Sequence, residues 1–166
     1  MGWLTSKSCI IQSEIGEFVT THNQLYEDKD GTIYLVPRFT QTDGYTIPLG
    51  INRTKYDIRP STLHDIGCKY HQLIKVNINK EILIQEYFYR IKDKVLCRDI
   101  PIDKLEVINI KFNKLNNIFK RSMVELDIPK SICSLYRIGV EFNIGFIFTG
   151  KDNININNIY NNILYT

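Results

Sequence analysis

Residues 24–36 read Gln-Leu-Tyr-Glu-Asp-Lys-Asp-Gly-Thr-Ile-Tyr-Leu-Val, two β-prone runs separated by a polar quartet that ends in glycine. The runs are 24–27 and 32–36, and a glycine-ended polar quartet between such runs is typical of a β-hairpin. Pro37 stops the second strand because proline has no amide hydrogen to donate to a sheet. We therefore predict that residues 18–41 are mainly β structure built around this hairpin.

Downstream of the hairpin, the pattern predicts a helix over residues 61–74. Its apolar residues recur at intervals of three and four positions, which gives the helix one buried face: Leu63, Ile66, Tyr70 and Leu73. Ser61 is the expected N-cap, since a serine hydroxyl can accept a hydrogen bond from a free amide of the first turn. Gly67 lies inside this segment and lowers its helix propensity by about 1 kcal/mol relative to alanine.

The strongest helical pattern spans residues 103–126, with Asp103 as its expected cap. Seven apolar residues step through it by three or four positions, which predicts a helix that faces the core: Leu105, Ile108, Phe112, Leu115, Phe119, Met123 and Leu126. Pro129 ends this helix, and residues 131–142 are predicted to begin another.

The chain, 1–166, is predicted to be a single α+β domain, with an N-terminal β-hairpin or small antiparallel sheet packed on a bundle of about three helices. Its 166 residues, 43% of them hydrophobic, suffice for one core. Residues 75–100 fit neither the helical nor the strand period cleanly, and we favour a β-hairpin that turns near Lys92. We treat about 75–105 as an insertion, and 151–166 as an ordered tail that docks on the domain or on a neighbouring chain.

Charge and composition narrow the classes of partner. The net charge is +3, the pI is about 8.6, and Lys and Arg are interleaved with acidic residues, so there is no strong signal for nucleic-acid binding. No apolar stretch reaches the roughly 20 residues of a membrane span, and the N-terminus does not have the pattern of a signal peptide. The four cysteines form no C-x-x-C pair, which indicates reduced thiols: Cys9, Cys68, Cys97 and Cys133. The chain has no alanine and is rich in Ile, Asn, Lys and Tyr, which is typical of an AT-rich genome.

One constellation on the predicted helix 61–74 points to a metal. His64, Cys68 and His71 have the spacing i, i+4, i+7 and lie within about 60° of one another around a helix. Two imidazoles and a thiolate at this spacing can bind one Zn²⁺ and leave a fourth position open. The alternative is structural: two histidines at the boundary of the core and a small buried cysteine. We rank the structural role first.

Two further polar residues bear on the role of His64. Asp65 follows it directly, and a histidine with a carboxylate partner can act as a general base. Neighbouring residues on a helix point about 100° apart, however, which directs Asp65 towards solvent or the preceding loop. Asn116 falls on the apolar arc of the predicted helix 103–126, where a buried amide needs hydrogen-bond partners. His64 is a suitable partner if the two helices pack together, and we favour a polar tie between the helices.

The segment 42–60 is a long predicted loop, and loops of this length in compact domains are often functional. It begins with Thr-Asp-Gly-Tyr-Thr-Ile-Pro at 42–48, in which Asp43 can form a local turn, point at His64 or hold a cation. The chain contains no P-loop and no G-x-G-x-x-G, G-x-S-x-G or H-E-x-x-H motif. These absences argue against a nucleotide enzyme or a common hydrolase.

Three blocks together resemble a phage and prophage family of unknown function. They are Val-Pro-Arg-Phe and Thr-Asp-Gly-Tyr-Thr-Ile-Pro within 36–48, Leu-His-Asp at 63–65, and Asn-Asn-Ile-Phe followed by Ser-Met within 116–123. Family members carry V-P-x-G-F-x-T-D-(F/G)-A-S-(I/V)-P, then L-H-D-x-x-Y, then A-D-x-x-F-x-x-A-M. The resemblance covers about residues 24 to 150. Cys68 stands where the family usually has Tyr, and Asn116 stands where it has Asp.

The family pattern resembles, more remotely, the helix pair of secreted phospholipases. In those enzymes a histidine on one helix pairs with an aspartate on the next, and the aspartate beside the histidine binds calcium. On this analogy Asn116 takes the place of the orienting carboxylate. An Asp-to-Asn change at such a position disables the histidine as a base by favouring the wrong tautomer, so the resemblance implies a copy without catalysis.

The resemblance also implies a role for the chain. It favours a phage-encoded structural or interaction protein of the virion or tail, located in the host cytoplasm or the virion, with other virion proteins or a host protein as partners and no cofactor. Two alternatives remain open. One is a hydrolase of the lysis or tail region that uses His64 with Asp43, Asp65 or Asn116, or with a metal such as Zn²⁺ or Ca²⁺. The other is an inhibitor of a host defence protein.

Overall fold

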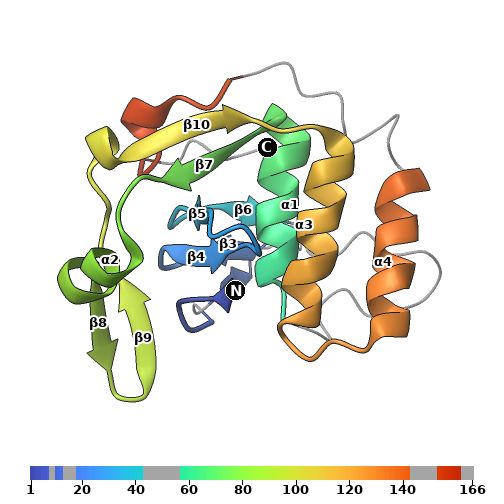
Figure 1. Cartoon of the computed structure of the whole chain (residues 1–166), viewed down its shortest axis with the longest axis horizontal. Coiled ribbons are helices and arrows are strands. Elements are labelled where there is room, and N and C mark those ends of the chain that lie inside the picture. Colours follow the sequence, from blue (N-terminus) through green and yellow to red (C-terminus); the bar gives the residue numbers. More distant parts are fainter. Residues whose placement is uncertain (8–9, 13–17, 43–56, 143–152, 162–166) are drawn as a thin grey trace.

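The computed structural model describes residues 1–7, 10–12, 18–42, 57–142 and 153–161, and it confirms the α+β class (Figure 1). At its centre is a five-stranded sheet in which all neighbouring strands are antiparallel. In order across the sheet the strands are β1 (Gly2–Trp3), β4 (Gln24–Glu27), β5 (Ile33–Val36), β7 (Gln72–Val76) and β10 (Leu105–Asn109). The helices α1 (Arg59–Tyr70), α3 (Phe112–Val124) and α4 (Lys130–Phe142) lie on one side of it in Figure 1.

The predicted hairpin is confirmed as β4–β5, with Gln24 paired to Val36 and Glu27 to Ile33. Its turn is closed by the Gly31 amide, which donates to the Asp28 carbonyl at 2.9 Å. Gly31 has a φ of 83°, in the left-handed region that glycine enters without a steric penalty. Local turn chemistry therefore sets the register of the two strands, as the sequence predicted.

The helix predicted over 61–74 is present as α1, but the last part of the prediction is wrong. His71 adopts a left-handed conformation (φ 52°), and its amide donates to the Gly67 carbonyl, which ends the helix. Residues from 72 onward form β7, because Leu73 and Ile74 are fully buried between β5 and β10. Ser61 is not the N-cap: Ile58 holds that position, and the Ser61 hydroxyl donates to the Ile58 carbonyl.

The helix predicted over 103–126 is correct only in its second half. Residues 105–109 form β10, an edge strand whose Leu105 pairs with Val76 and whose Asn109 pairs with Gln72. Asp103 caps no α-helix and lies in a short 3₁₀ turn, Ile102–Lys104. The three-residue spacing of apolar side chains in 105–108 fits a helix, but pairing with β7 decides the conformation.

The remaining elements surround this framework. The predicted turn near Lys92 is confirmed by the hairpin of β8 (Phe88–Ile91) and β9 (Lys94–Cys97), whereas α2 (Lys80–Tyr87) was not predicted. The helix predicted over 131–142 is confirmed as α4. Three short strands form a second sheet: β2 (Ile10–Gln12), β3 (Phe18–Thr20) and β6 (Gln41–Thr42). No helix in the described ranges is long and apolar enough to cross a membrane.

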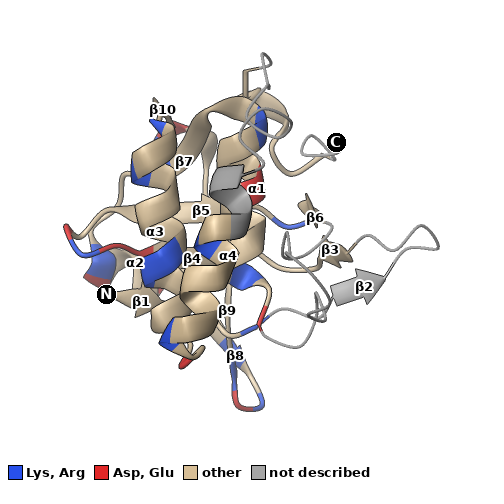
Figure 2. Cartoon of the chain, turned by 90° about the vertical axis from the view of Figure 1, so that its right-hand side faces the viewer, with Lys and Arg blue, Asp and Glu red and all other residues tan. Residues whose placement is uncertain are grey.

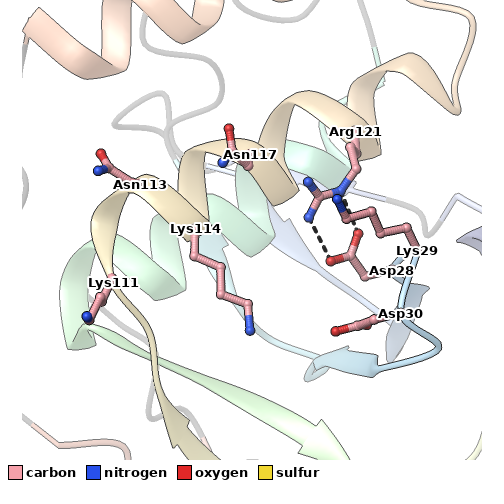
Figure 3. A pocket seen from close by; sticks show the side chains of 8 residues that line it. All are labelled: Asp28, Lys29, Asp30, Lys111, Asn113, Lys114, Asn117 and Arg121. Carbon is pink, nitrogen blue, oxygen red and sulfur yellow. Dashed lines mark hydrogen bonds and ion pairs between the residues drawn. The ribbon is translucent and has the colours of Figure 1, made fainter.

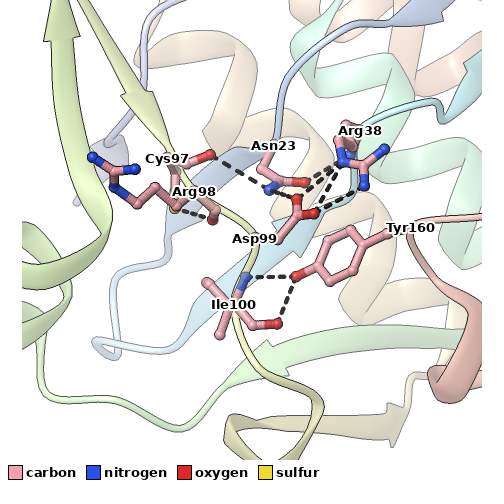
Figure 4. Close-up of polar contacts among 7 residues, drawn as sticks. All are labelled: Asn23, Arg38, Cys97, Arg98, Asp99, Ile100 and Tyr160. Atoms are coloured by element: carbon pink, nitrogen blue, oxygen red, sulfur yellow. Dashed lines mark hydrogen bonds and ion pairs between the residues drawn. The ribbon is translucent and has the colours of Figure 1, made fainter.

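Residues 153–161 of the tail, which include the 3₁₀ turn η2 (Ile156–Asn158), dock on the sheet side of the domain. Ile154 and Ile159 are buried in the main core, and the Tyr160 hydroxyl bonds both the amide and the carbonyl of Ile100 at 2.8 Å. An adjacent cluster, seen in Figure 4, joins the end of β5 to the end of β9. In it Arg38 holds Asp99 with two nitrogens, and the Asn23 amide donates to the same carboxylate at 2.8 Å.

Helices α1 and α3 approach each other closely at Gly67. A Cβ atom at this position would lie 2.4 Å from Leu115 Cδ1 and 2.6 Å from Cδ2, and Leu115 is fully buried. Gly67 is therefore required for close approach of the two helices, and this need outweighs its poor helix propensity.

Replacement of Gly67 by alanine tests this packing. Overpacking of a buried site costs about 1–3 kcal/mol, whereas alanine gains at most about 1 kcal/mol of helix propensity. We expect Gly67→Ala to lower the free energy of unfolding measured by urea titration. The matched control is Gly67→Ala in a Leu115→Ala background, where the clashing side chain is gone and the cost should shrink. A Gly67→Ala protein more stable than the wild type would contradict this packing.

Candidate functional site

His64 and Asn116 meet at the interface of α1 and α3, as predicted for a polar tie between the two helices. Their side chains are 4% and 1% exposed, and His64 Nε2 lies 2.9 Å from Asn116 Oδ1. The imidazole also rests against the Phe119 ring, with 4.5 Å between ring centroids. The contact joins two residues that are 52 positions apart in sequence.

The hydrogen bonds around the imidazole assign its tautomer. Because Asn116 offers its carbonyl oxygen, Nε2 carries the proton and donates. Nδ1 is then the acceptor, and the Cys68 thiol lies 3.5 Å from it as the donor. Burial, with the nearby Asp65 carboxylate adding to it, raises the pKa of Cys68 well above its ordinary value, so the group stays a thiol. A thiol is neither the nucleophile nor the metal ligand that a thiolate would be.

Burial also controls the charge of His64. It lowers the pKa of His64 to about 4, and the hydrogen bond from the ring to Asn116 offsets only part of this effect. The imidazole is therefore neutral at neutral pH. A buried, neutral ring with both nitrogens engaged is suited to holding two helices together and has no open position for a substrate.

Asp65 connects α1 to a different part of the chain. Its Oδ2 accepts a short hydrogen bond from the Thr42 hydroxyl at the end of β6, where the long segment 42–60 begins. The prediction that Asp65 points towards the preceding loop is therefore confirmed. Asp43, the other candidate of that loop, lies outside the described residues.

The three predicted zinc ligands are only partly brought together. His64 and Cys68 are in contact, whereas His71 is the half-buried residue that turns the chain from α1 into β7. In the described part of the chain, no three His, Cys, Asp or Glu side chains are placed to hold one metal ion. The described geometry supports a structural role at this position, namely a hydrogen bond between α1 and α3.

Sequence reasoning missed a second cluster, a pocket between the β4–β5 turn and α3 (Figure 3). It measures about 380 Å³, and all eight residues that line it are polar or charged: Asp28, Lys29, Asp30, Lys111, Asn113, Lys114, Asn117 and Arg121. Arg121 closes one side by donating two hydrogen bonds of 2.8 Å to Asp28. The available signal was the polar row at 113, 117 and 121, which shares one helix face, but only the tertiary structure joins this row to the turn.

Acidification should lower the free energy of unfolding because His64 is buried in its neutral form. The unfolded chain protonates His64 near its ordinary pKa of 6.5, whereas the folded protein resists protonation down to about pH 4. Between these values the unfolded state binds more protons, so the free energy of unfolding falls as the pH falls. The expected loss between pH 7 and pH 5 is about 2 kcal/mol.

Urea titrations at the two pH values test this expectation. His64→Gln, which keeps an amide beside Asn116, should lose less stability on acidification than the wild type. His22→Gln, at a partly buried site beside Thr21, is the matched control for the loss of one histidine. The same pH dependence in His64→Gln and in the wild type would show that His64 is not buried in its neutral form.

Comparisons of the chain with protein-family models, with curated proteins and with solved structures gave no match. The phage-family resemblance therefore remains a prediction that rests on the residues quoted for it.

Proposed function

We propose that this chain is a phage-encoded structural or interaction protein that takes a place in the virion or tail assembly, binds a phage or host protein, and catalyses no reaction. One observation carries the proposal. The histidine of the signature is buried, neutral and bonded to a carboxamide, so it serves the packing of α1 on α3.

The identity of residue 116 supports the absence of catalysis. A catalytic histidine that gains a proton is stabilised by a buried carboxylate on its other nitrogen. Asn116 supplies no negative charge, and the lowered pKa of His64 disfavours the imidazolium. The same geometry gives a satisfied hydrogen bond inside a helix interface, which is the common role of buried polar groups.

The surface of the α2–β8–β9 unit supports an interaction role. Three isoleucines there are 45–53% exposed: Ile82, Ile84 and Ile91. One of them, Ile84, also lines a mainly apolar pocket of about 320 Å³, together with Leu4, Phe88, Tyr89, Arg90 and Val95. An exposed apolar side chain at the edge of an apolar pocket is typical of protein–protein contact sites.

Quantitative mass spectrometry of purified particles tests the proposal. We expect the chain in fixed stoichiometry in virions of the phage that encodes it. Ile84→Glu should reduce its incorporation, because the substitution puts a charge on the apolar surface. Gln85→Glu is the matched control, since it adds the same charge at a neighbouring exposed position of α2. Absence of the wild-type chain from particles would contradict the proposal.

A second readout separates this role from hydrolysis. His64→Gln, if folded, should be incorporated and should support plaque formation like the wild type. A folded His64→Gln chain that enters particles but abolishes infection would instead favour the His-dependent hydrolase.

A further inference from the structure

The pocket between the β4–β5 turn and α3 is rich in hydrogen-bond donors. Four of its side chains are cationic, namely Lys29, Lys111, Lys114 and Arg121, and two more, Asn113 and Asn117, are carboxamides. In Figure 3 the Lys114 side chain extends towards the turn, and Lys29 lies beside Arg121, whereas the Asn113 and Asn117 side chains point away from the turn. Figure 2, which views the molecule from the side of α3 and α4, shows Lys and Arg recurring along both helices.

The two carboxylates of the pocket are already engaged by the protein. Asp28 is 2% exposed and receives both of its bonds from Arg121 Nε and Nη2. Asp30 accepts from the Thr32 amide at 2.9 Å, and this bond, with a smaller contribution from Lys114, lowers the pKa of Asp30. Both carboxylates therefore have partners within the fold.

The cations are less fully used. Lys29, Lys111 and Lys114 form no ion pair with any other residue that the structure describes. Arg121 bonds Asp28 through Nε and Nη2, and its Nη1 takes no part in that pair.

We propose that this pocket binds the phosphate groups of a small molecule. Ammonium, guanidinium and carboxamide groups all donate hydrogen bonds, and oxygens of a phosphate accept them with net charge attraction. No aromatic or aliphatic residue lines the pocket, so a stacked base or an apolar ligand gains no contact from it. Its volume of about 380 Å³ lies within the range of small-ligand sites. This inference is independent of the proposed virion role.

Calorimetric titration of the full chain with tripolyphosphate, at constant ionic strength, tests the site. We expect saturable binding with one ligand per chain. Lys111→Gln combined with Lys114→Gln should weaken it by about tenfold or more, since two charged donors are lost. Lys104→Gln, at the far end of β10, is the charge control and should change the affinity less than about twofold. Urea midpoints confirm that each variant is folded.

Asp30→Asn should change the affinity for tripolyphosphate in the opposite direction to the lysine variants. The asparagine oxygen can still accept the Thr32 amide, while the repulsive charge beside the ligand is removed, so tripolyphosphate should bind more tightly. The proposal fails if the wild type shows no saturable binding at millimolar ligand, if Lys104→Gln weakens binding as much as the double variant, or if Asp30→Asn weakens it.

Two further ligands identify the chemistry. Citrate, a carboxylate anion of comparable charge, should bind at least about tenfold more weakly than tripolyphosphate; equal affinities would overturn the assignment to phosphate. A short DNA duplex should show no tighter binding per site than tripolyphosphate. Tighter, steeply salt-dependent DNA binding that is lost in the double variant would assign the pocket to nucleic acid and overturn the small-molecule assignment.

Discussion

The contact between α1 and α3 is the constraint on which the rest of the fold depends. It combines a close approach at Gly67 and Leu115 with the hydrogen bond between His64 and Asn116. Since α1 leads directly into β7 and α3 follows β10, this contact helps to position β7 against β5 of the hairpin and β10 against β7. A polar tie in an apolar interface also selects one register of the two helices, because any sliding leaves a buried donor unpaired.

The two faces of α3 lie in different environments, one buried and one exposed to solvent. Its buried face carries Asn116, which is satisfied by a neutral histidine, and its exposed face carries Asn113 and Asn117 beside lysines that form no ion pair with the residues the structure describes. The same residue type is thus a packing device on one side and a candidate ligand contact on the other. Burial makes the difference, because it removes charge from the interface while solvent keeps the lysines of the exposed face charged.

The sequence was informative where structure is local. The hairpin at 24–36 and the tie between His64 and Asn116 were predictable, since turn chemistry and two apolar helix faces carry them. Strands β7 and β10 were not, because apolar spacing of three and four residues fits a helix until the pairing of Leu105 with Val76 is known. The charged pocket could not be predicted either, since Asp28 and Arg121 are 93 positions apart in sequence and meet only in the folded chain.

The most direct test of this account is the state of the His64 imidazole, measured by long-range ¹H–¹⁵N NMR as a function of pH. The account predicts a proton on Nε2, a bare Nδ1 that accepts from Cys68, and a ring that stays neutral from about pH 8 to about pH 5. A ring that titrates near its ordinary pKa of 6.5, or that carries its proton on Nδ1, would contradict it. His64 would then be free to exchange protons, and the signature would have to be considered as a catalytic site.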